Sequence, residues 1–129
     1  MDMRRLVGVA GVLVALGTSA AACGGSDGGS AYKEPAGPAV ATVKVLAGNS
    51  WFRPKQVSSP AGIVLIRLKN SESGVHTLVI QDIADFKLQV SGRGATDESK
   101  VELKRGKYTF YCNIPGHREA GMEGTITVH

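Results

Sequence analysis

The chain has 129 residues, 43% of them hydrophobic, and a formal net charge of +4 at pH 7. This length allows one domain with a single modest core. The basic residues are scattered along the chain, and only 5% of the residues are aromatic. Because a nucleic-acid interface needs a basic stripe with exposed aromatic side chains, we expect no nucleic-acid partner.

The N-terminus has the order of charged, apolar and small residues that is typical of a signal peptide. Arg4 and Arg5 precede an apolar run over residues 6–16, and small residues then lead to Cys23. A membrane-spanning helix needs about 20 apolar residues, and this run is shorter. We therefore expect residues 1–22 to be a signal peptide that directs export.

Cys23 stands where a bacterial lipoprotein carries its lipidated cysteine, and the segment before it resembles a lipobox. Ala20 replaces the usual leucine, so simple secretion after A-x-A cleavage is the alternative. Gly, Ser, Ala and Pro dominate the following stretch, which is typical of a flexible linker. We expect residues 23–39 to hold the lipidation site and this linker, residues 40–129 to form the domain, and a lipid on Cys23 to anchor the chain to the periplasmic side of the cytoplasmic membrane.

Residues 40–129 show no clear 3.6-residue apolar period, whereas short strand-like runs recur between turn residues. Seven or eight short strands predict an all-β, two-sheet Greek-key sandwich. The last two runs before the final strand are expected to form a hairpin around Arg105 and Gly106. The expected strand runs are residues 41–47, 56–58 after a lead-in over 51–54, 63–70, 76–80, 86–90, 99–103, 107–112 and 124–128.

The last eighteen residues contain Cys112, His117 and Met122 in the spacing C-x4-H-x4-M. A thiolate, an imidazole and a thioether on one loop suit copper, because Mg2+ and Ca2+ prefer oxygen ligands and structural zinc rarely takes a thioether. A second imidazole must come from His76 or His129. His76 is favoured because it opens an apolar strand, whereas His129 ends the chain beyond the last strand. We predict one copper held by His76, Cys112 and His117, with Met122 as a weak axial ligand.

The strand before Cys112 supports this position for the thiol. Tyr108, Phe110 and Cys112 alternate onto one face, which should be the core face because two aromatic rings need burial. An apolar environment disfavours a thiolate unless a cation compensates its charge. The alternative for two cysteines in an exported chain is a disulfide to Cys23, and the place of Cys23 at the edge of a leader argues against it.

The order of the ligand residues and of the turn and core residues around them resembles that of the cupredoxins, the small blue-copper family that includes plastocyanin, pseudoazurin and amicyanin. The resemblance implies a sandwich fold, the ligand roles given above, and electron exchange with a redox partner protein of the cell envelope at the edge of His117. One departure is Thr77, which stands where the family often has an asparagine whose amide ties the two ligand loops together. The matching landmarks are Phe52-x-Pro54, Pro60-Ala61-Gly62, Asn70, His76, Gly106-x-Tyr108-x-Phe110-x-Cys112, Pro115-Gly116-His117 and Gly121-Met122-x-Gly124.

We expect a monomeric type 1 copper electron-transfer protein without enzymatic activity. Copper delivery to an envelope oxidase is the alternative, although delivery proteins often carry methionine-rich or histidine-rich sites and Met122 is the one methionine after the leader. A nucleophilic Cys112 with a histidine base is disfavoured by the inward direction of the thiol. Nitrite reduction needs a second copper with further histidines, and only His129 would remain for it.

Overall fold

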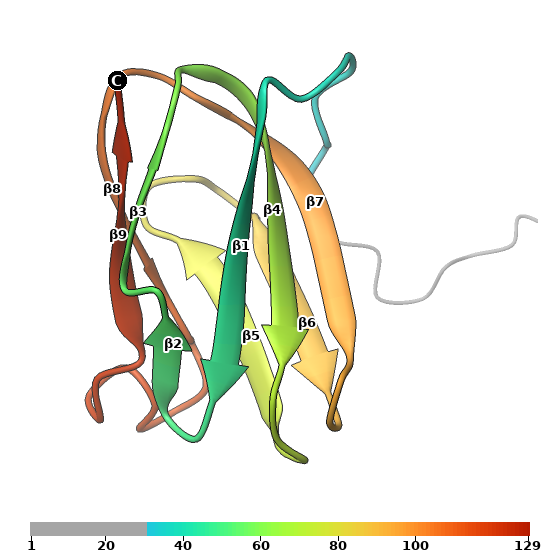
Figure 1. The fold of residues 1–129 in the computed structure, drawn as a ribbon, viewed down its shortest axis with the longest axis vertical. Coiled ribbons are helices and arrows are strands. Elements are labelled where there is room, and N and C mark those ends of the chain that lie inside the picture. Colours follow the sequence, from blue (N-terminus) through green and yellow to red (C-terminus); the bar gives the residue numbers. More distant parts are fainter. Residues whose placement is uncertain (1–30) are drawn as a thin grey trace, which may run out of the picture.

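The computed structural model describes residues 31–129, which form a sandwich of two β-sheets (Figure 1). One sheet has the strand order β2-β1-β4-β7 and the other β3-β9-β8-β5-β6. The predicted all-β sandwich is confirmed, with nine strands in the described part of the chain where seven or eight were expected. The strands are β1 (Ala41–Gly48), β2 (Trp51–Arg53), β3 (Gln56–Ser59), β4 (Gly62–Asn70), β5 (Val75–Ile80), β6 (Lys87–Ser91), β7 (Thr96–Leu103), β8 (Gly106–Tyr111) and β9 (Glu123–Val128).

The core lies between the sheets and follows the two-residue period of the strands. In β4, Val64, Ile66 and Leu68 are fully buried, while the residues between them lie on the outer face. Gly124 of β9 is opposite Phe110 of β8, and a Cβ at residue 124 would lie 2.3 Å from the Phe110 ring. Glycine at this position therefore allows the buried ring to pack against the neighbouring strand.

The prediction of a hairpin between β7 and β8 is wrong. β7 pairs antiparallel with β4 in one sheet, whereas β8 pairs with β5 and β9 in the other. The chain therefore crosses between the sheets after Leu103. The Tyr108 hydroxyl accepts a hydrogen bond from the Lys104 N–H (3.0 Å) and lies 3.1 Å from the Lys104 carbonyl, which fixes the crossing. A tyrosine bonded to backbone a few residues upstream is a known device at such corners.

The domain contacts begin before Val40, within the segment expected to be linker. The Tyr32 ring packs edge-on against Phe86 with 5.1 Å between centroids, and its hydroxyl donates to the Lys100 carbonyl (2.7 Å). The Glu34 carboxylate accepts the Lys100 N–H (2.6 Å). Burial, and secondarily the charge of Glu34, raise the pKa of Tyr32, so the phenol stays protonated as a donor. Residues 31–37, here called the strap, thus contact β7 at Lys100.

The connection before the strand that carries His76 and the connection that carries Cys112, His117 and Met122 lie at one end of the sandwich. Figure 1 shows the β4–β5 and β8–β9 connections at the end opposite the C-terminus. Cys23 and the expected signal peptide fall outside the described residues. From residue 31 onward, the structure contains no helix long and apolar enough to cross a membrane.

Candidate metal centre

The pairing of β5 with β8 brings two predicted ligands from distant parts of the sequence together. Val79 lies opposite Tyr111 and Ile80 opposite Phe110 in this antiparallel pair. His76 stands near the start of β5 and Cys112 directly follows β8. Both therefore lie at the same end of the same sheet, with His76 1% and Cys112 0% exposed.

His117 completes the cluster from the β8–β9 connection. Ligand atoms of His76, Cys112 and His117 all lie within 4.8 Å of one another, the one such group of His, Cys, Asp or Glu side chains in residues 31–129. His117 Nδ1 is 3.4 Å from the Cys112 sulfur, and the two imidazole centroids are 5.2 Å apart. His117 is half-buried, whereas His76 and Cys112 are buried. The structure thus brings together the three residues predicted for the trigonal plane.

Backbone hydrogen bonds close the loop from Cys112 to Met122. The Cys112 N–H donates to the Met122 carbonyl (3.1 Å), and the Met122 N–H donates to the His117 carbonyl (3.0 Å). The His117 N–H in turn donates to the Ile114 carbonyl (3.1 Å). Gly116, at φ +85°, takes a left-handed conformation that other residues rarely adopt. Met122 is fully buried beside this loop, which is compatible with the predicted axial role.

Thr77 and Asn113 connect the two segments that carry the ligands. The Asn113 N–H donates to the Thr77 hydroxyl (3.0 Å), which donates to the Asn113 side-chain oxygen (2.6 Å). The Thr77 N–H and hydroxyl both lie 3.5 Å from the Cys112 sulfur. The family often has an asparagine amide directly after the first ligand histidine. Here Asn113, directly after Cys112, supplies the amide that ties the two segments together. Sequence reasoning missed Asn113, although its adjacency to Cys112 was a visible signal.

Arg118 fixes the far side of the ligand loop. Its guanidinium carbon lies 3.9 Å from the centroid of the Tyr111 ring, and its Nη2 donates to the Gln81 side-chain oxygen (3.1 Å). Its Nε pairs with the Glu123 carboxylate at 2.5 Å. An exposed ion pair alone contributes little. Together these contacts hold the loop against β8, β9 and the residue that follows β5.

One buried nitrogen at the centre has no hydrogen-bond partner. In residues 31–129, His76 Nδ1 is the one fully buried side-chain nitrogen or oxygen without such a partner. The other ring nitrogen, Nε2, contacts the Glu72 carboxylate. Because a carboxylate only accepts, Nε2 is the nitrogen that donates to it, and in the neutral imidazole Nδ1 then presents a free lone pair. An unpaired buried nitrogen next to a thiol and a second imidazole fits a soft or borderline metal ion such as copper.

The remaining histidine lies elsewhere. The His129 N–H donates to the Ser59 carbonyl (3.0 Å) and its own carbonyl accepts from the Ala61 N–H (3.1 Å). These contacts place it at the C-terminal end of the sandwich, opposite the ligand loops (Figure 1). His129 is therefore not part of the cluster.

Comparisons with known proteins place the chain in a copper-binding family. A family model described as copper binding proteins, plastocyanin/azurin family, matches residues 39–129. The fold is similar to reduced auracyanin of the photosynthetic bacterium Roseiflexus castenholzii, with a TM-score of 0.62 and 21% identity over 71% of this chain and 99% of that one. It is also similar to auracyanin B, with a TM-score of 0.60 and 22% identity over 74% and 94% of the two chains. None of the curated protein sequences compared with the chain matches it.

We predict that one equivalent of Cu(II) gives the purified protein an intense visible absorption band. Such a band arises from charge transfer between a thiolate and copper, so Cys112→Ser should remain nearly colourless. His76→Ala should lose the band as well, because it removes the free Nδ1. His129→Ala is the matched control and should stay coloured. An equally intense band in Cys112→Ser would contradict the assignment of the thiolate.

Proposed function

Because this chain belongs to the plastocyanin/azurin family of copper-binding proteins, we propose that it transfers electrons through one type 1 copper held by His76, Cys112 and His117. The observation that carries this function is the buried His-Cys-His cluster with an unpaired imidazole nitrogen. Met122 is proposed as the weak axial ligand, since it is buried and its backbone is bonded to both Cys112 and His117. When bound, copper supplies a one-electron Cu(I)/Cu(II) couple.

The residues around the centre keep its geometry constant and exclude water. His76, Cys112 and Met122 are each at most 1% exposed. Thr77 with Asn113 and the backbone bonds of the ligand loop hold the donors in place without a metal. A site whose donors are held by their own contacts needs little rearrangement on a change of charge. Fast electron exchange requires such a site.

The open side of the centre is where we place the partner. His117 is half-buried, and Pro115, Gly116 and Ala120 around it are exposed and small or compact. Small neighbours allow another protein to approach the imidazole edge closely. We propose a redox partner protein of the cell envelope that binds there in a small, transient complex.

Proteins of this family are generally electron carriers, and we propose that this chain has no catalytic activity of its own. The Cys112 sulfur is fully buried and lies beside Thr77 and His117, so no substrate reaches it as a nucleophile. Copper delivery is the second candidate. The burial of His76 and the closed ligand loop favour retention of the metal over its release.

We further propose that the protein is exported and anchored to the membrane through a lipid on Cys23. The support is the signal-like sequence before Cys23 and the Gly- and Ser-rich stretch after it. The first described contacts with the domain occur at Tyr32. Only a few residues would then separate the anchor from the strap.

Electron transfer and copper delivery are separated by exchange kinetics. We predict a reversible one-electron couple by voltammetry, together with slow loss of copper from the reduced protein to an excess of a Cu(I) chelator. The buried donors and the closed loop give the physical reason. Loss of copper as fast as mixing would instead support delivery.

Substitution of Met122 tests the axial role. Met122→Leu removes a sulfur donor that stabilises Cu(II) more than Cu(I), so the reduction potential should rise; Met122→Gln supplies an oxygen donor, so it should fall. For a one-electron couple about 59 mV corresponds to a tenfold change in the equilibrium constant, which voltammetry resolves. Both variants should stay coloured. An unchanged potential in Met122→Leu would exclude Met122 as an axial ligand.

The anchor is tested by expressing the full chain in a bacterium that processes lipoproteins. We predict that the wild type sediments with membranes and that Cys23→Ala is released or left unprocessed. Ser26→Ala, close to Cys23 but without a thiol, is the control and should behave as the wild type. An exported wild type found entirely in the soluble fraction would refute the anchor and leave the copper site unaffected.

A further inference from the structure

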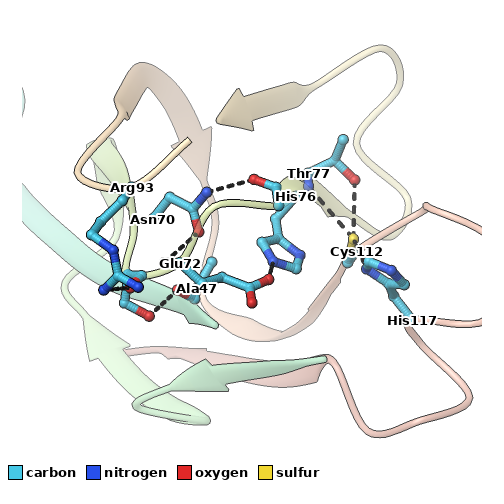
Figure 2. Close-up of polar contacts among 10 residues, drawn as sticks. Ala47, Asn70, Glu72, His76, Thr77, Arg93, Cys112 and His117 are labelled. Atoms are coloured by element: carbon cyan, nitrogen blue, oxygen red, sulfur yellow. Dashed lines mark hydrogen bonds and ion pairs between the residues drawn. The ribbon is translucent and has the colours of Figure 1, made fainter. Parts of the chain in front are cut away.

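The connection between β4 and β5 places a carboxylate against the buried ligand histidine. Glu72 Oε1 contacts His76 Nε2, on the side of the ring away from Cys112 and His117 (Figure 2). The His76 side chain is 2% exposed and that of Glu72 is 30% exposed, so the carboxylate lies between the imidazole and solvent. Sequence analysis missed Glu72; its position four residues before His76 was the available signal.

The segment that carries Glu72 is fixed from its own N-terminal side. Asn70, which is fully buried, accepts the Glu72 N–H at its side-chain oxygen (3.3 Å). The same side chain donates from Nδ2 to the Gly74 carbonyl (2.7 Å). Asn70 therefore spans the turn from residue 70 to 74 and holds its backbone independently of the Glu72 carboxylate.

Neighbouring segments hold the same turn from outside. The Ser71 N–H and hydroxyl both donate to the Ala47 carbonyl of β1, at 2.9 and 2.7 Å. Arg93 donates to the Ser71 carbonyl (2.9 Å), and the Gly92 N–H donates to the Gly74 carbonyl (3.2 Å). Figure 2 shows Arg93 and Ala47 on one side of His76 and the Cys112 and His117 side chains on the other.

Gly74 leaves the space that the carboxylate occupies. A Cβ at residue 74 would lie 2.9 Å from Glu72 Oε1 and 3.7 Å from His76 Nε2. Any larger residue would therefore require the carboxylate to shift from its present position. The buried amide of Asn70, the bonds to Ser71 and the missing side chain at Gly74 all favour the same position for Glu72.

We propose that Glu72 is a positioning and charge-setting residue for the metal centre, an inference that rests on the proposed copper function. By accepting the Nε2 proton of His76, it fixes the tautomer in which Nδ1 is free and holds the ring plane. Its negative charge lies on the imidazole edge opposite Cys112 and His117. Because that charge favours the more positive ion, Glu72 stabilises Cu(II) relative to Cu(I) and lowers the reduction potential.

Two substitutions separate the charge of Glu72 from its hydrogen bond. Glu72→Gln keeps an oxygen that can accept from Nε2 but removes the negative charge. Glu72→Ala removes both. Glu102→Gln makes the same change in net charge at an exposed position on β7 and is the matched control. β7 belongs to the sheet that does not contain His76.

With the full-length, copper-loaded protein, we expect Glu72→Gln to stay coloured. Its reduction equilibrium should shift at least tenfold toward Cu(I), a rise of about 59 mV, because the charge is lost. Its affinity for Cu(II) should fall tenfold or more, as is usual on loss of a partner of a ligand histidine. Glu102→Gln should leave both quantities at the wild-type values. A potential and an affinity in Glu72→Gln equal to those of Glu102→Gln would overturn the charge-setting role.

A measurement on the metal-free protein tests the positioning role without copper. Nitrogen NMR of His76 should show one tautomer, with Nε2 protonated, in the wild type and in Glu72→Gln. Glu72→Ala should show a mixture of tautomers, and a single unchanged tautomer in that variant would overturn the positioning role. If the wild type fails to bind copper, the proposed function fails, and the NMR result still decides whether Glu72 fixes His76.

Discussion

The metal centre depends on the register in which β5 pairs with β8. Val79 lies opposite Tyr111, and the same register continued outward places Thr77 beside Asn113, where hydrogen bonds join them. Because side chains alternate between the faces of a strand, a slip of one residue would turn the Cys112 thiol away from the core. The burial of Phe110 fixes this register, so the same packing that stabilises the sandwich also aims the sulfur at the cluster.

The donors of the centre are held by contacts within the chain, and this has an energetic consequence. The backbone bonds between Cys112 and Met122 and the contacts of Arg118 define the loop, so the donors need not be ordered at the moment of binding. The unpaired Nδ1 of His76 is the cost of this arrangement, since a buried nitrogen without a partner destabilises the fold. A metal that binds Nδ1 removes this cost, so its binding stabilises the native state.

The two ligand histidines have different surroundings, which suggests a division of roles within the proposed function. His76 is 1% exposed and is backed by Glu72 on a turn that Asn70 and Ser71 hold rigidly. His117 is half-buried on a loop with small exposed neighbours. In the proposed function, Glu72 acts electrostatically on the ion from the closed side, and we propose that electrons are exchanged at the open side. Different segments build the two sides: the β4–β5 connection carries Glu72, and the β8–β9 connection carries His117.

The sequence by itself determined the features that depend on local pattern. Period-two runs between turn residues predicted the all-β sandwich, and the spacing of Cys112, His117 and Met122 on one loop predicted a copper site. His76 followed from its place at the start of an apolar strand. These inferences succeeded because a strand alternates its side chains and a short loop keeps its donors together whatever the rest of the chain does.

Only the tertiary structure decided which strands pair and what surrounds the donors. The crossing from β7 to β8 reads locally as a hairpin, but pairing with β4 and β5 places the two strands in different sheets. The strap from Tyr32 packs on Phe86 although its neighbours read as linker. Asn113 and Glu72 acquire their roles only once separate segments are held beside the cluster. Such contacts depend on the choice of partner over long sequence separations, and that choice is set by the packing of the whole core and by no local period or spacing.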